Sequence, residues 1–151
     1  MHPTMPRHGR IRFLAFGLFP LVNVVAMALY GLEVSTVGSY AQGQTIPVLV
    51  ALMALGLLQT AIAAVKRARD IGLPAKVGIP IFVVSVATGP LVFAWVAFLA
   101  FAAGKPGDNE LGPVPEPMGW QGWLKALVLL ALPWLLVLAL TTAWSRRWLM
   151  P

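Results

Sequence analysis

Four long apolar runs separated by short polar segments dominate the chain. They cover about residues 11–32, 45–65, 77–103 and 124–143. A helix needs about 20 apolar residues to cross the hydrocarbon core of a bilayer, so each run is long enough to do so. The pattern predicts an all-α integral membrane protein, with four transmembrane helices in a single membrane domain over 1–151.

Composition supports this class and excludes others. The chain is 59% hydrophobic with a mean hydropathy of +0.82, and 11% of its residues are charged, against about 25% in soluble domains. The net charge of +6 would suggest nucleic acid in a soluble protein. Here the basic residues lie at the ends of apolar runs, where they set orientation and meet anionic lipid. We therefore expect membrane lipids as partners and no nucleic acid.

Prolines inside the runs predict kinked helices. Pro20, Pro90 and Pro133 each remove one backbone donor from a helix. The third run would form a helix of about 40 Å, longer than the hydrocarbon core of about 30 Å. We expect one span kinked at Gly89 and Pro90. Two short re-entrant halves are the alternative, which would leave backbone groups unpaired in lipid.

The first run also has features of a signal peptide. A basic lead precedes it, and Ala26 and Ala28 are small enough for a cleavage site. The run continues through Tyr30, which is long for a signal peptide, so we expect it to stay as a span.

The most charged segment is a polar turn over 66–76. Asp70 follows Arg67 by three residues and Lys66 by four, so it can pair with either at a helix end. An ion-paired turn that anchors the spans is one interpretation. A contact for a partner or for the phosphate of an anionic lipid, with Arg67 and Arg69 as donors, is the other.

The basic residues predict the orientation. With four spans and both termini in the cytoplasm, nine of the eleven lysines and arginines are cytoplasmic. Only Lys105 and Lys125 then lie on the other side. The positive-inside rule favours this arrangement over its inverse.

Small and polar residues within the spans suggest helix contacts. Gly56, Thr60 and Ala64 recur every four residues and form a stripe on which another helix can pack closely. Asn23 and Gln59 place amides inside the first two spans. Each can form an interhelical hydrogen bond or line a polar path.

A Pro/Gly-rich loop over 104–118 connects the last two spans on the non-cytoplasmic side. Its candidate structural turn consists of Pro106, Gly107, Asn109 and Gly112, and the first two fit the centre of a type II turn. The oxygens of this loop could attract calcium, but their spacing matches no calcium loop, so a turn is expected. The last span is bracketed by an expected interfacial belt of tryptophans, namely Trp120, Trp123, Trp144 and Trp148.

No catalytic arrangement is evident. The spans contain no serine–histidine pair, paired carboxylates, glycine-rich phosphate loop or metal-ligand cluster. The sequence therefore predicts no enzymatic activity, no cofactor, no metal and no soluble substrate.

Three segments resemble a known family. They are Gly9-Arg10-Ile11-Arg12 before the first span, Lys66-Arg67-Ala68-Arg69-Asp70-Ile71-Gly72 after the second, and Pro106-Gly107-Asp108-Asn109-Glu110-Leu111-Gly112-Pro113 after the third. Their order and spacing are similar to those of the small bacterial inner-membrane proteins called domain of unknown function 805. Ala68 and Arg69 stand where that family usually has leucine and histidine. The resemblance implies a bacterial inner-membrane location and no particular activity.

Three functions are compatible with these features. The first is an accessory or structural subunit that packs against a larger membrane protein complex, because the chain is small and its spans carry almost no ionisable side chains. The second is a protein that binds anionic lipid. The third is a small oligomeric transporter or channel, in which Asn23, Gln59, Ser85 and Thr88 would line a path.

Overall fold

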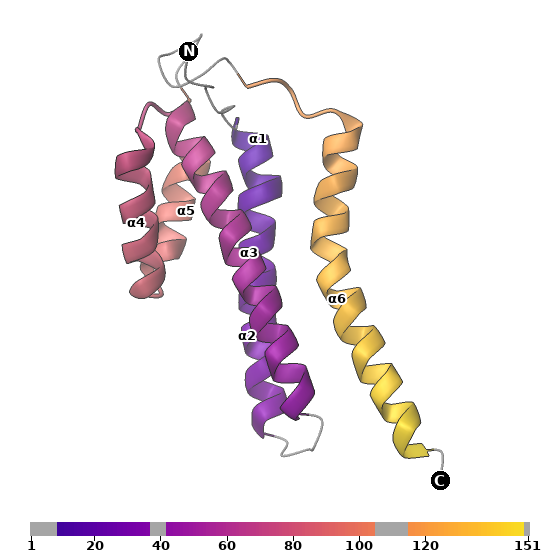
Figure 1. Cartoon of the computed structure of the whole chain (residues 1–151). Coiled ribbons are helices and arrows are strands. Elements are labelled where there is room, and N and C mark those ends of the chain that lie inside the picture. The colour runs from indigo at the N-terminus through magenta and orange to yellow at the C-terminus, as the bar shows by residue number, and fades with distance from the viewer. Residues whose placement is uncertain (1–8, 37–41, 105–114, 150–151) are drawn as a thin grey trace.

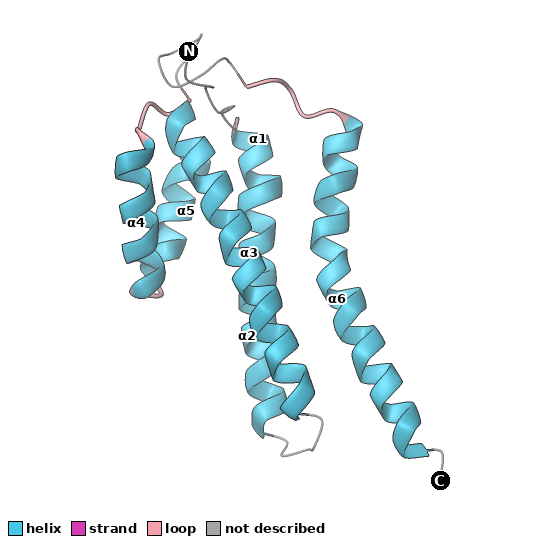
Figure 2. Cartoon of the chain, viewed as in Figure 1, coloured by secondary structure: helices cyan, strands magenta, loops and turns pink. Residues whose placement is uncertain are grey.

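All regular secondary structure in the part that the structure describes is helical. A computed structural model describes residues 9–36, 42–104 and 115–149 (Figure 1). No strand occurs among these residues (Figure 2). The elements, in order, are α1 Arg10–Phe13, the π-helical turn η1 Leu14–Leu18, α2 Phe19–Thr36, α3 Gln42–Asp70, α4 Ala75–Ala87, α5 Leu91–Phe101 and α6 Trp120–Leu149.

Three helical segments are long and apolar enough to cross a membrane. They are Arg10–Ser35, Thr45–Asp70 and Trp120–Ala139, with hydropathies of 2.0, 2.4 and 2.0. The first consists of α1, η1 and α2 in one continuous rod. It runs beside α3 for most of its length, and α6 stands to one side of this pair (Figure 1).

The third apolar run does not form a single kinked span, which corrects the prediction of four spans. It folds into α4 of 13 residues and α5 of 11 residues, about 20 Å and 17 Å long, and both are too short to cross a core of about 30 Å. Figure 1 shows α4 leaving the end of α3 and α5 returning beside it. We call α4, residues 88–90 and α5 the re-entrant hairpin.

Local chemistry explains why the chain turns at Gly89 and Pro90. Gly89 has φ of +70°, a conformation that side-chain-bearing residues rarely adopt, and it ends α4. The Thr88 N–H donates to the Val84 carbonyl at 3.0 Å and the Gly89 N–H to the Val86 carbonyl at 3.1 Å. Pro90 has no N–H to satisfy. The backbone N–H groups of the turn are thus satisfied by carbonyls at the end of α4.

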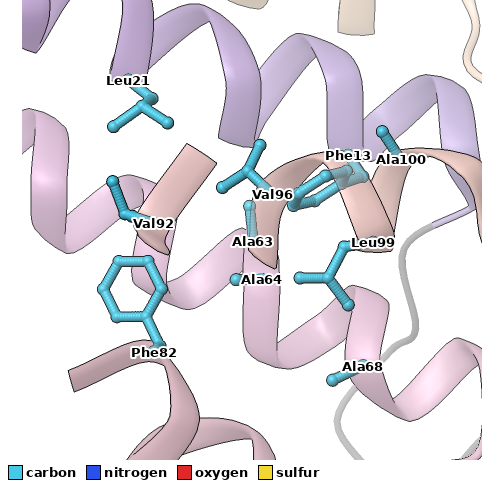
Figure 3. Packing of buried hydrophobic residues seen from close by; sticks show 10 residues of the cluster. All are labelled: Phe13, Leu21, Ala63, Ala64, Ala68, Phe82, Val92, Val96, Leu99 and Ala100. Carbon is cyan, nitrogen blue, oxygen red and sulfur yellow. The ribbon is translucent and has the colours of Figure 1, made fainter. Parts of the chain in front are cut away.

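Packing holds the re-entrant hairpin against the long helices. Val92, Val96 and Leu99 on α5 are buried against Phe13 of α1 and Ala63 of α3, in a cluster that Figure 3 shows from close by. The small side chains on α3 allow α5 to approach it closely. Because α5 returns to the end from which α4 left, the expected fourth crossing is lost.

The loss of this crossing changes the predicted position of the carboxyl terminus. Helix α1 begins at one end of the bundle and α6 ends at the other (Figure 1). The start of α1 and the end of α6 thus lie at opposite ends of the bundle, whereas the sequence predicts both termini on the same side.

Pro20 and the small-residue stripe shape the contact between α2 and α3. Pro20 cannot bond to the carbonyl four residues before it, and the wider turn η1 directly precedes α2, as expected where a helical ladder is interrupted. The Thr60 hydroxyl donates to the Gly17 carbonyl of η1 at 3.1 Å. A Cβ on Gly56 would lie only 2.6 Å from a methyl group of Val24, so the two helices need a glycine here.

Candidate functional site at the basic end

A buried ion pair lies where the end of α3 meets the end of α5. Arg67 is 2% exposed and Asp70 is 3% exposed, and the Arg67 guanidinium pairs with the Asp70 carboxylate. Its Nε donates to the Leu99 carbonyl at 2.9 Å and its Nη2 to the Ala102 carbonyl at 2.5 Å. One side chain thus links α3 to the last turn of α5.

This arrangement follows from the needs of a helix end. The last carbonyls of α5 have no partner within the helix and carry a partial negative charge. Arg67 satisfies two carbonyls at this end, and Arg10 donates to a third, that of Phe101, at 3.3 Å. Two arginines from separate elements therefore close the carboxyl end of the re-entrant hairpin.

Segments flanking the helices converge on the ion pair. A Cβ on Gly104 would lie 2.5 Å from the Asp70 carboxylate oxygen Oδ2, so only glycine fits beside this carboxylate. Arg12 donates to the Pro117 carbonyl at 3.4 Å, and its Nη2 lies 3.8 Å from a Glu116 carboxylate oxygen. Contacts to both ends of the loop over 104–118 therefore meet here.

An open groove of about 480 Å³ lies over the ion pair. It is lined by Gly9, Arg10, Ile11, Arg67, Asp70, Gly104 and Pro115. The Asp70 carboxylate on its wall repels anions, and both arginines already donate to carbonyl groups of the protein. This groove is consequently a poor site for a phosphate.

The four charged residues of the predicted contact site have different roles. Arg67 and Asp70 are buried in the ion pair, whereas Lys66 and Arg69 are only half-buried. The Arg67 guanidinium faces the protein, so the contacts it forms here are those of the ion-paired turn, the first of the two interpretations of this segment. Lys66 and Arg69 remain accessible at this end of the molecule.

Asn23 joins α2 to α6 at a point where Pro133 interrupts the backbone ladder. Pro133 cannot donate to the Leu129 carbonyl four residues before it. The Asn23 amide donates to the carbonyls of Leu129 at 3.4 Å and Leu130 at 3.1 Å. Its oxygen accepts a hydrogen bond of 3.1 Å from the Trp134 indole N–H. The amide thus compensates for the missing donor and fixes α6 beside α2.

The four residues of the predicted path do not line one common cavity in the part of the chain that the structure describes. Asn23 and Gln59 line the same cavity between α2, α3 and α6. The hydroxyls of Ser85 and Thr88, on α4 and its C-cap, donate to carbonyls of that helix at 2.6 Å and 2.9 Å. They serve their own backbone, and neither lines the cavity.

Other predicted site residues lie partly outside the described residues. Trp120 and Trp123 are exposed in the first turn of α6, as an interfacial position requires. Trp144 and Trp148 belong to helix α6, but their side chains are not described. The predicted turn residues Pro106, Gly107, Asn109 and Gly112 lie outside the described residues. Within the described ranges, no group of three or more histidines and acids could hold a metal ion.

Sequence reasoning missed the role of Arg10 and Gly104. Arg10 helps to close α5 from 91 residues away, and Gly104 leaves room for the Asp70 carboxylate of α3, so no local pattern reveals either role. A weak signal was present, because Arg10 is a basic residue directly before the first run and Gly104 is a glycine directly after the third run.

Comparison with known proteins identifies a family. No curated protein and no solved structure matches the chain. A family described as "Protein of unknown function (DUF805)" matches residues 4–113, which include α1 to α5, the ion pair and all three motif segments. Helix α6 lies outside the match. Since the match covers more than half of the sequence, this protein belongs to the DUF805 family.

Proposed function

We propose that the protein is a non-enzymatic accessory subunit that packs against a larger integral membrane complex through its re-entrant hairpin. The observation that carries this proposal is the exposed turn of the hairpin. Ala87, Thr88, Gly89, Pro90 and Leu91 are all exposed, although the turn lies about half-way along α3 (Figure 1).

The bilayer makes such a turn costly. Irregular backbone at membrane depth is tolerated only where protein covers it or where it lines a water-filled cavity. The described part of this chain supplies no cover, and the surrounding side chains Val83, Val84 and Phe93 are exposed and apolar, which disfavours water. A protein surface in the membrane is the cover that meets both conditions.

The orientation belongs to the same proposal. Helices α1, α4 and α6 begin and α3 ends at one end of the bundle (Figure 1), and the basic residues of these helix ends are Arg10, Arg12, Lys66, Arg67, Arg69, Lys76 and Lys125. The positive-inside rule favours this end in the cytoplasm, in a bacterial inner membrane as the family resemblance implies. The carboxyl terminus then lies on the non-cytoplasmic side.

Extraction and cross-linking test the proposal together. A photoreactive amino acid replaces Thr88 at the hairpin turn, and a control carries it at Val128, an exposed position on α6. After irradiation, membranes are solubilised in mild detergent, separated on native gels and analysed by mass spectrometry. We expect the chain in a defined larger complex, with Thr88 cross-linked to a protein of that complex. Migration alone, or cross-links from Thr88 to lipid only, would contradict the proposal.

Binding of anionic lipid is a second candidate function. Lys66 and Arg69 are half-buried at the basic end, and Arg67 beside them is neutralised by Asp70. Replacing Lys66 and Arg69 together by glutamine should then lower the amount of anionic phospholipid that copurifies. Lys125→Gln is the matched control. Equal lipid in both variants would exclude this function.

A further inference from the structure

A cavity of about 280 Å³ lies between α2, α3 and α6, within the candidate spans. Most of its lining is leucine and proline side chains, and two amides, those of Asn23 and Gln59, complete it. An apolar cavity with few polar groups is the usual form of a small-molecule site.

The two amides differ in their hydrogen bonds. Asn23 is buried, and both ends of its amide are used by Leu129, Leu130 and Trp134. Gln59 is half-buried, and its amide forms no hydrogen bond with the part of the chain that the structure describes. A polar group without a partner in hydrocarbon costs several kcal/mol, so Gln59 needs a partner from outside these helices.

The depth of Gln59 restricts the nature of that partner. It follows Thr45 by 14 residues and precedes Asp70 by 11 residues within the span Thr45–Asp70. At about 1.5 Å per residue, it lies about 2 Å from the middle of that segment. Phospholipid headgroups stay at the interface and do not reach this depth, and a carboxylate there would be strongly disfavoured.

We propose that this cavity binds an isoprenoid quinone. Such a molecule has a neutral ring with carbonyl acceptors on a long apolar tail, and it dissolves in the middle of the bilayer. The Gln59 Nε2 donates to a ring carbonyl, the leucines of α3 and α6 cover the ring, and the tail leaves between α3 and α6. This inference is independent of the accessory-subunit proposal, because the hairpin does not line the cavity.

The glycine and prolines of the lining support a built cavity. Gly56 and Pro20 form one wall, and the close packing of α2 and α3 leaves no room for a side chain at position 56. Pro133 forms the opposite wall, and the Asn23 hydrogen bonds hold its segment of α6 in place.

Quinone titration into the intact chain tests the proposal. The protein is reconstituted in phosphatidylcholine nanodiscs, and decylubiquinone is added while tryptophan fluorescence is recorded. Trp134, which contacts Asn23 beside the cavity, makes ring binding visible as quenching. We expect a saturable component for the wild type. Gln59→Leu should weaken it three- to tenfold, the value of one hydrogen bond between neutral groups.

Matched variants and a ringless probe complete the test. Gln121→Leu makes the same exchange at an exposed position in the first turn of α6 and should bind as the wild type does. Leu132→Phe enlarges an exposed lining residue and should also weaken binding, whether or not Gln59→Leu folds. Three results would each overturn the proposal: quenching that never saturates, equal affinities for all variants, or equal displacement by decylcyclohexane, which has the tail and no carbonyl.

Discussion

Arg67 illustrates how a cation is accommodated inside a membrane protein. A buried charge is costly unless it is paired and its donors are used. The Arg67 guanidinium has Asp70 as counter-charge and two carbonyls of the α5 end as acceptors. Lysine could not replace it, because an ammonium lacks the planar fork that reaches all three groups.

The ion pair leads to a prediction about stability. Arg67→Met removes the counter-charge of a buried carboxylate and the donors to Leu99 and Ala102. We expect a loss of about 3–5 kcal/mol in the free energy of unfolding, as for other broken buried pairs. Denaturant unfolding in detergent micelles, followed by circular dichroism, measures it.

Two further variants define the cause of that loss. Arg69→Gln, which changes a half-buried neighbour, should stay within about 0.5 kcal/mol of the wild type. Combining Arg67→Met with Asp70→Leu should recover part of the loss, since no carboxylate is then buried. If Arg67→Met were as stable as Arg69→Gln, the pair would contribute nothing to the fold.

Asn23 and Pro133 form a second residue-level unit. Asn23→Leu leaves the Leu129 carbonyl and the Trp134 N–H without the amide, and it should cost about 0.6–2 kcal/mol. Pro133→Ala restores a backbone donor for Leu129. The same Asn23→Leu exchange should therefore cost less in the Pro133→Ala background. A double-mutant cycle on unfolding free energies measures this coupling, and purely additive effects would refute it.

At the scale of elements, the re-entrant hairpin separates what the sequence predicts from what it does not. Apolar length and hydropathy predict the helices of the first, second and fourth runs, because these properties are local. The direction of the third run is not local. It depends on the closure of α5 by Arg10 and Arg67, which are 91 and 32 residues away from their acceptors. It also depends on Gly89, and a glycine at this position is compatible with a kinked helix as well as with a tight turn.

The site shows the same division. The pairing of Asp70 with Arg67 was among the predicted possibilities because both lie on one helix end, three residues apart. The Asn23 bridge required knowledge of which helix faces α2. Its partner Leu129 is 106 residues away, and the sequence does not determine which helix packs beside α2.

Gly89 provides a test at the level of this element. Its φ of +70° would strain any other residue, although no atom lies within 4 Å of a built Cβ. Gly89→Ala should therefore cost about 1–2 kcal/mol in unfolding free energy for conformational reasons alone. Gly119→Ala is the matched control, because that glycine also has open space and no positive φ. Equal effects of the two exchanges would show that the turn is formed differently.

At the scale of the whole molecule, the positive-inside rule does not separate three crossings from four. Counted along the sequence, four crossings place Lys105 and Lys125 outside, and three crossings place Arg146 and Arg147 outside. Nine of the eleven basic residues lie inside in either case. The rule thus fixes the amino-terminal end and says nothing about α6.

Cysteine labelling decides between the two topologies, because the chain has no cysteine of its own. Single cysteines are placed at Lys76, at Gln121 in the first turn of α6, and after Pro151. They are exposed to a membrane-impermeant maleimide in right-side-out vesicles. With a re-entrant hairpin, only the cysteine after Pro151 reacts, and the other two require permeabilised membranes. Four crossings would produce the opposite result at two sites, since Gln121→Cys would react from outside and the terminal cysteine would not. Each topology requires one of these two cysteines to react in intact vesicles, so a cysteine that fails to react only because it is inaccessible cannot be mistaken for evidence of either topology.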